Sequence, residues 1–148
     1  MNEVIPGSES VGAVQAERRS LEQGVVADRN KPLGPRLLLH AEGATLFVAC
    51  VAAYAILGGN WWLFLVLLLA PDLSMLGYLA GNRIGAFVYN AVHAYPLPAL
   101  LGAFGLLAAQ PLATWLALIW LAHIGMDRTV GYGLKYTTAF KDTHLARV

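Results

Sequence analysis

Four long apolar segments follow a polar N-terminal stretch in this chain. Residues 1–35 are rich in charged and small polar side chains and hold no apolar core, which predicts a disordered tail. The first three apolar segments are Leu37–Leu57, Trp61–Ala80 and Gly85–Ala109. Each has at least 20 residues. That is enough for an α-helix to cross a hydrocarbon core about 30 Å thick.

The fourth segment begins at Pro111, a favoured first-turn position of helices. Its purely apolar part, Leu112–Met126, is short for a crossing, so we expect the helix to continue through Asp127 toward Gly131. The short connections make consecutive helices antiparallel neighbours. The sequence therefore predicts an all-α membrane protein with four transmembrane helices in an antiparallel bundle over residues 36–134, followed by a C-terminal segment of residues 135–148.

The composition agrees with a membrane location. Hydrophobic residues make up 57% of the chain and charged residues 13%. Soluble domains hold about 25% charged residues, roughly twice this share. The formal net charge of +1 gives no basis for binding nucleic acid, so membrane lipids are the expected partners.

The basic residues predict the orientation of the helices. All ten Lys and Arg residues fall on the side of the tail and the C-terminal segment. Because basic loops stay in the cytoplasm, both termini are predicted to be cytoplasmic, which requires an even number of crossings. These residues are Arg18, Arg19, Arg29, Lys31, Arg36, Arg83, Arg128, Lys135, Lys141 and Arg147.

Several ionisable residues of the apolar segments gather near the cytoplasmic side. At a rise of 1.5 Å per helical residue, all lie within about 15 Å of that interface. His123 and Asp127 are four residues apart and share one helix face. Pro71 interrupts the second helix beside Asp72, and the backbone groups that it frees predict a polar cavity. With Asn90 as a polar neighbour, the candidates are His40, Glu42, Asp72, His93, His123 and Asp127.

These side chains have the chemistry of a metal centre. Imidazoles and carboxylates ligate zinc and other divalent ions, and ionisable groups at membrane depth usually pair and face inward. We expect a divalent ion, zinc before others, with ligands from His40, Asp72, His93, His123 and Asp127. The same residues also suit a structural or proton-handling polar network without metal. No specific metal signature such as HExxH decides between the two.

The C-terminal segment has two possible arrangements. Asp142 and His144 alternate along it, and they either fold back beneath the cluster or belong to a solvated tail. Because chain ends are usually solvated, we expect the tail.

Five short runs of the sequence form a recognisable set: His40–Gly43, Ala70–Tyr78, Tyr89–Tyr95, Ala122–Arg128 and Gly131–Tyr136. Together they resemble an uncharacterised bacterial family of small membrane proteins, known as domain of unknown function 4260. The resemblance covers about Leu37–Leu145 and implies a bacterial inner-membrane protein with no established activity.

A looser similarity is to the bacterial membrane-bound metal-dependent hydrolases. Only Pro71-Asp72 and the scattered histidines match their pattern, and Ser74 stands where that family has a second acid. The leading hypothesis, which rests on the cluster of ionisable residues, is a membrane-embedded metal-dependent hydrolase that acts on a lipid or other amphiphile from the cytoplasmic leaflet. In it, Glu42 or Asp72 is the general base and Arg128 holds an anionic headgroup.

Two other functions fit the same residues. One is a non-enzymatic transporter, proton-handling or binding module with a buried His/Asp network. Four helices are few for an independent transporter, so this function requires a homo-oligomer. The other is a structural subunit whose polar cluster stabilises helix packing. Metal analysis of the purified protein separates the metalloenzyme from both.

Overall fold

The computed structural model describes residues 15, 18–19, 34–138, 143 and 145. Contacts divide the chain into two units, Met1–Gly34 and Pro35–Val148. The predicted disordered tail, residues 1–35, therefore lies almost entirely outside the described residues. All of the candidate site residues belong to the second unit.

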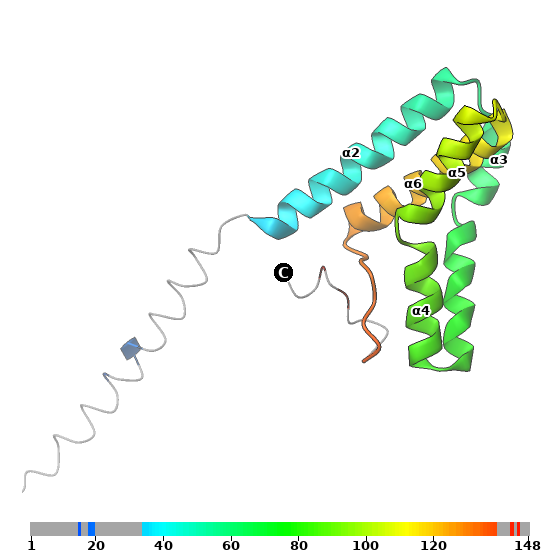
Figure 1. The fold of residues 1–148 in the computed structure, drawn as a ribbon. Helices are drawn as coiled ribbons and strands as arrows, with labels where there is room; N and C mark the ends of the chain where they lie inside the picture. Colours follow the sequence, from blue (N-terminus) through cyan, green and yellow to red (C-terminus); the bar gives the residue numbers. More distant parts are fainter. Residues whose placement is uncertain (1–14, 16–17, 20–33, 139–142, 144, 146–148) are drawn as a thin grey trace, which may run out of the picture. The chain divides into compact units, whose positions relative to one another are not determined.

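Helices build the second unit (Figure 1), and the prediction of an all-α fold is confirmed for the residues described. The only β-type pairing among them is an isolated antiparallel bridge between Lys135 and Thr143. In chain order the elements are α2 (Pro35–Ile56), α3 (Trp61–Leu67), the 3-10 helix η1 (Ala70–Ala80), α4 (Asn82–Val92), α5 (Pro96–Leu107) and α6 (Pro111–Val130).

The first and last predicted helices form nearly as expected. α2 begins two residues before the predicted start and ends one residue before the predicted end. α6 continues through Asp127, as predicted, and stops at Gly131. Gly131 has a φ of 94°, a left-handed conformation that favours glycine, and the Tyr132 amide donates to the Asp127 carbonyl at 2.7 Å. This is the hydrogen-bond pattern of a Schellman motif.

The two middle helices are broken: the predicted interruption of the second helix beside Pro71 is confirmed, whereas the predicted continuity of the third helix is wrong. Pro71 has no amide hydrogen to donate and its ring crowds the carbonyl four residues earlier, so α3 ends at Leu67 and the tighter η1 follows. The third predicted helix splits into α4 and α5 because Pro96 has no amide hydrogen to donate to the Val92 carbonyl four residues earlier, and its ring crowds that carbonyl. Pro96 is visible in the sequence, but it lies inside the apolar run that was read as one helix.

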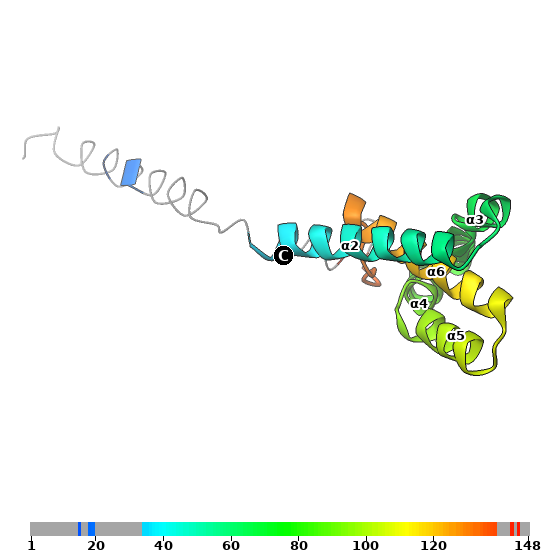
Figure 2. The same ribbon diagram turned by 90° about the horizontal axis from the view of Figure 1, so that it is seen from above.

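α6 is the central helix of the unit. Nine of its residues are buried, and its main partners are α2 and α5, while α4 packs antiparallel against η1 (Figure 1). Both views show α6 beside α2 (Figure 2). The two helices approach closely where glycines meet: a Cβ added at Gly125 would lie 2.7 Å from the Phe47 nitrogen and 2.9 Å from the Gly43 carbonyl oxygen. Small residues permit such contacts between helices.

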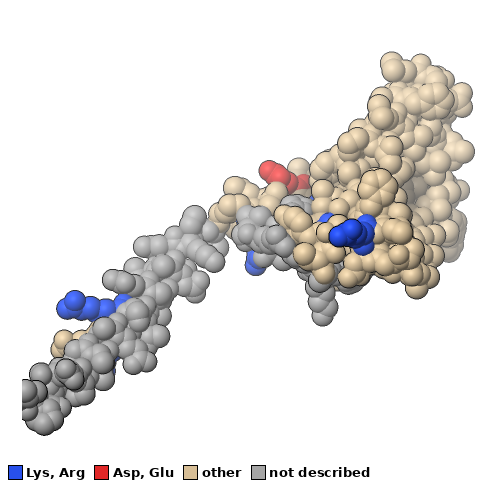
Figure 3. All heavy atoms as spheres, turned by 60° about the horizontal axis from the view of Figure 1, so that its bottom comes forward, with Lys and Arg blue, Asp and Glu red and all other residues tan. Residues whose placement is uncertain are grey.

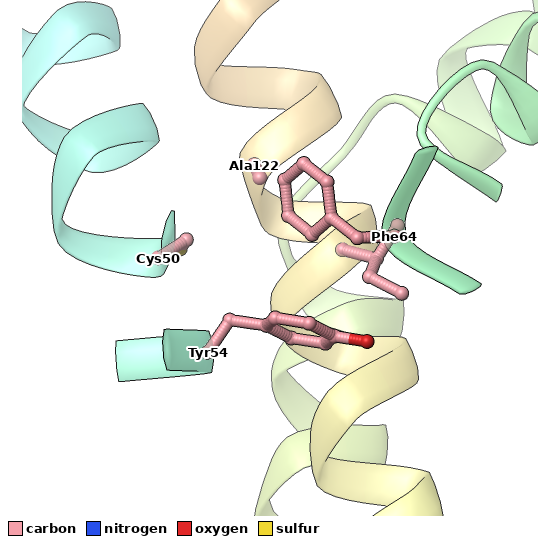
Figure 4. Close-up of a cluster of buried hydrophobic side chains, with 5 residues drawn as sticks. Cys50, Tyr54, Phe64 and Ala122 are labelled. Atoms are coloured by element: carbon pink, nitrogen blue, oxygen red, sulfur yellow. The ribbon is translucent and has the colours of Figure 1, made fainter. Parts of the chain in front are cut away.

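An apolar core lies where α2, α3 and α6 meet. Tyr54 is fully buried in it, and Figure 4 shows its ring extending from α2 toward Phe64 of α3. The Tyr54 hydroxyl donates to the Asn60 carbonyl at 2.7 Å, and the Asn60 side chain accepts from the first amides of α3. The connection between α2 and α3 is therefore fixed at both of its ends.

Within the described residues, two stretches are long and apolar enough to cross a membrane: α2 and Trp61–Ala80 taken across its break. Few of their residues are buried within the protein, so their apolar side chains face outward. In Figure 3 the coloured charged side chains lie toward one end of the unit, and the opposite end is tan. A large exposed apolar surface marks a membrane or protein contact. The third predicted crossing is divided into two short helices, and the fourth carries charged residues in its last turns.

Candidate metal centre

Four potential metal ligands from three helices converge at one point. Asp72 comes from the first turn of η1, and His93 caps the C-terminal end of α4. His123 and Asp127 come from successive turns of α6. One ligand atom from each residue can be chosen so that all four lie within 4.8 Å of one another.

The separations between each histidine Nε2 and the other three ligand atoms come close to those of a tetrahedral site. Zinc bonds of about 2.0–2.1 Å at tetrahedral angles place neighbouring ligand atoms about 3.3 Å apart. The two Nε2 atoms of His93 and His123 are 3.0 Å apart. Asp72 Oδ1 lies 3.6 Å from each of them, and Asp127 Oδ2 lies 3.6 Å from the first and 3.9 Å from the second. A cation at the centre would be within bonding distance of all four after small adjustments.

Helix geometry explains why these residues meet. The i,i+4 spacing of His123 and Asp127 places both on one face of α6. Pro71 lies in the first turn of η1. Asp72 is the next residue, so it stands at the break in the second predicted helix. His93 stands at the break in the third helix, where its amide makes the last α-helical bond of α4. Both breaks thus lie at the cluster.

Tyr89 and the backbone orient the ligands. The His93 Nδ1–H donates to the Tyr89 carbonyl at 2.9 Å, so the lone pair of the neutral ring lies on Nε2, toward the cluster. The Tyr89 ring stacks on the His93 ring at 3.7 Å, and its hydroxyl donates to Asp127 Oδ2 at 3.0 Å. Metal-ligating histidines and carboxylates are typically held by outer hydrogen bonds of this kind.

The cluster concentrates hydrogen-bond acceptors. His93 Nε2 and the two carboxylate oxygens approach one another, with one N–H at most on His123 Nε2 and with the Tyr89 hydroxyl on Asp127 Oδ2. The other ring nitrogen of His123 is buried and has no hydrogen-bond partner among the described residues. A metal ion or additional protons at this point would offset the repulsion between the acceptors.

The centre is closed on most sides and accessible on one. The side chains of His93, His123 and Asp127 are 3%, 0% and 10% exposed, whereas that of Asp72 is 35% exposed. Catalytic zinc sites keep a position open for water, while structural sites are closed by four protein ligands. Asp72 is therefore the most accessible of the four side chains, and its exposed edge is the side from which a small molecule would approach.

A protein-family model described as "Domain of unknown function (DUF4260)" matches residues 36–148. The chain belongs to this family. The resemblance seen in the sequence is thereby confirmed, and the matched range contains all four residues of the cluster. No curated protein and no solved structure matches the chain. The similarity to membrane-bound metal-dependent hydrolases stays a prediction.

Three of the predicted site residues, His40, Glu42 and Arg128, lie outside the group of four in the described structure. His40 is outside the group of four, and its Nδ1–H donates to the Thr129 carbonyl at the end of α6 at 2.7 Å. Glu42 is exposed on α2. Arg128 is buried, and its guanidinium donates to the His93 carbonyl at 3.4 Å, where it can support the turn that carries this ligand.

The start of the C-terminal segment packs next to the cluster. Asn90 on α4 exchanges two hydrogen bonds with the Lys135 backbone, at 2.7 and 2.8 Å. Lys135, Thr143 and Leu145 are buried, so the predicted solvated tail is wrong for these residues, while Asp142 and His144 lie outside the described residues. Burial lowers the pKa of the Lys135 ammonium, against the opposing effect of Asp127 and Asp72.

Sequence reasoning missed Tyr89 and Lys135 as neighbours of the cluster. Tyr89 had a usable signal, because it precedes His93 by one helical turn and so shares its face. Lys135 had none, since its position depends on the chain folding back after Gly131. Its ammonium lies 4.8 Å from the centre of the Tyr89 ring, a cation–π contact.

A cavity of about 340 Å³ also opens at the broken helices. It is lined by apolar side chains of α3, η1, α5 and α6, with Val92 from the end of α4. A cavity beside Pro71 was predicted to be polar, and this is wrong, because the side chains that line it are apolar. The polar groups at this break are concentrated in the cluster itself.

Proposed function

We propose that this protein is a membrane-embedded metalloenzyme that holds one divalent ion, most suitably zinc, between Asp72, His93, His123 and Asp127. The observation that carries the proposal is the convergence of these four ligand atoms within 4.8 Å, with near-tetrahedral separations. A network of protons alone does not require this geometry, whereas a metal ion does. Two neutral imidazoles and two carboxylates would also balance a charge of +2.

The chemistry that such a centre supports best is hydrolysis. A bound divalent ion lowers the pKa of a water molecule and polarises the bond to be cleaved. The protein side chains would orient the substrate and transfer the proton. Asp72 is the suited group, because its carboxylate combines proximity to the centre with an exposed edge. Zinc sites can expand to five ligands, which leaves room for water beside four protein donors.

The proposed location is the inner membrane, with four crossings and both termini in the cytoplasm. The distribution of the ten basic residues supports this topology, and α2 and Trp61–Ala80 support the first two crossings. Within a bilayer, interrupted helices occur where the freed backbone is buried in protein or lines a cavity. Both breaks lie at the cluster and its neighbouring cavity, as this rule requires. The substrate would accordingly be a lipid or another amphiphile.

Metal content tests the proposal. The purified protein in detergent is analysed for bound elements, next to His123→Ala, Asp72→Asn and the control His40→Ala. Wild type should hold close to one divalent ion per chain. His123→Ala and Asp72→Asn should lose most of it, because three donors remain of four. His40→Ala should retain it, since His40 lies outside the cluster.

Asp72→Asn guards against misfolding, because it preserves side-chain shape at a partly exposed position. Folding of each variant is checked by circular dichroism and size-exclusion chromatography. A folded wild type that holds no metal and does not bind added zinc would overturn the proposal. It would favour the proton-handling network instead.

A further inference from the structure

The apolar cavity beside the cluster is positioned like a substrate pocket. Its volume of about 340 Å³ falls within the range of ligand pockets, roughly 300–1,000 Å³. It is also about twice the size of an engineered cavity of about 150 Å³ that binds benzene. A hydrocarbon chain of several carbons would fit a space of this size.

The same elements supply the cavity wall and the metal ligands. Pro71 in the wall is followed directly by Asp72, and Val92 is followed directly by His93. On α6, Ile119 in the wall is four residues before His123, on the same helix face. One helical turn rises about 5.4 Å, so the wall begins about one turn from the cluster.

The wall offers a ligand little besides apolar contact. Trp120 carries its most polar side-chain group, the indole N–H, and this group already donates to the Val92 carbonyl at 2.7 Å. That bond satisfies the carbonyl freed at the end of α4 and fixes the indole ring in the wall. A polar or charged occupant would lose its hydration there without compensation, which excludes it on energetic grounds.

We infer that the cavity binds the hydrocarbon chain of an amphiphile whose polar group reaches the metal. This inference rests on the proposed function, and it names the substrate class of that site. The head enters at the exposed edge of Asp72, and the chain lies between α5 and α6 against Ile119 and Trp120. A chain attached to a metal-bound head has a high effective concentration in the cavity, which unattached lipid chains lack.

Alkyl hydroxamic acids can test this inference, because the hydroxamate group binds metal ions and the chain length can be varied. The cobalt(II)-substituted protein is titrated in one detergent with acetohydroxamic acid and with octanohydroxamic acid. Binding is followed by the change in the visible spectrum of cobalt. Wild type should bind the longer acid at least about tenfold more tightly, since each buried CH₂ adds affinity.

Two variants of α5 separate the cavity from general effects of the detergent. Leu101→Trp places a large ring in the cavity without altering a ligand-bearing helix. Leu100→Trp, the matched control, adds the same ring at a neighbouring exposed position outside the wall. Leu101→Trp should lose the preference for the longer acid while its affinity for acetohydroxamic acid stays within about twofold, because the metal is untouched. Leu100→Trp should behave as wild type.

Each outcome decides between the two claims. Equal affinity of wild type for both acids, or a preference that survives in a folded Leu101→Trp, overturns the inference and leaves the metal centre intact. Failure of the wild type to bind cobalt(II) or acetohydroxamic acid overturns the proposed function, and the inference with it. If Leu101→Trp does not fold, Leu67→Trp fills the cavity from α3, which also carries none of the four ligands, and serves in its place.

Discussion

Removing one hydroxyl group, in Tyr89→Phe, should weaken metal binding without removing a ligand. The Tyr89 hydroxyl donates to Asp127 Oδ2 at 3.0 Å, and both residues are buried. Phenylalanine keeps the ring that stacks on His93 at 3.7 Å, so the substitution isolates the hydrogen bond. Without it, the Asp127 carboxylate is free to rotate away from the point where the four ligand atoms meet.

The expected loss of zinc affinity is about 10- to 100-fold. Outer partners of metal ligands typically change affinity by this factor. A hydrogen bond to a charged group contributes at most about 3 kcal/mol, and about 1.4 kcal/mol corresponds to a factor of ten, so the full bond energy sets an upper limit of roughly 100-fold. The hydroxyl also donates to Asp127 before the ion binds, so the effect arises from orientation of the carboxylate.

Competition with a chromophoric zinc chelator measures the dissociation constant of each variant. Tyr54→Phe is the matched control, because Tyr54 is also fully buried and its hydroxyl also donates one hydrogen bond, to the Asn60 carbonyl. That control should lower thermal stability and leave zinc affinity unchanged. Equal zinc affinity of Tyr89→Phe and wild type would refute the reasoning. So would an equal loss in Tyr54→Phe, since it would indicate general destabilisation.

Two further predictions concern helix packing and topology. Gly125→Ala should lower the thermal unfolding midpoint by an amount that corresponds to about 1–3 kcal/mol, because the added Cβ meets the α2 backbone, which cannot rotate away. Gly102→Ala, whose Cβ would meet only the Ala117 Cβ at 3.3 Å, should change it little; a midpoint for Gly125→Ala as high as that of this control would contradict the argument. Reporter tags should place both termini in the cytoplasm and the connection of residues 58–60 on the other side. A C-terminal tag outside the cytoplasm would exclude the four-crossing topology.

The sequence predicted the cluster better than the helices that carry it. Counting residues along each predicted helix placed Asp72, His93, His123 and Asp127 at a similar distance from the cytoplasmic interface. The i,i+4 spacing placed His123 and Asp127 on one face of α6. The helix breaks change the course of the backbone, but the four residues still meet at one point.

Depth was less informative for His40. It meets the end of α6 instead, at the carbonyl of Thr129, two residues beyond Asp127. A difference of one turn, about 5.4 Å, exceeds the whole span of the four ligand atoms. Hydrophobic patterns locate a residue in the membrane to within about a turn, and a coordination shell needs finer placement than that.

The breaks illustrate a second limit of pattern reading. Pro71 was recognised because it stands beside an acid, whereas Pro96 and Pro98 were absorbed into an apolar run. Proline removes a backbone donor regardless of how apolar its surroundings are. The hydrophobic pattern therefore indicated the length of the segment and concealed its division into α4 and α5.

The order of the four ligand residues along the chain has a consequence for biogenesis. Asp72 leaves the ribosome first and Asp127 last, and the final two come from a single helix at the end of the domain. A chain that stops before α6 holds only two of the four donors, too few for a stable zinc site. Metal loading would therefore follow membrane insertion of the last helix. An ion acquired at that stage would join the early and late parts of the chain and make incomplete chains distinguishable from finished ones.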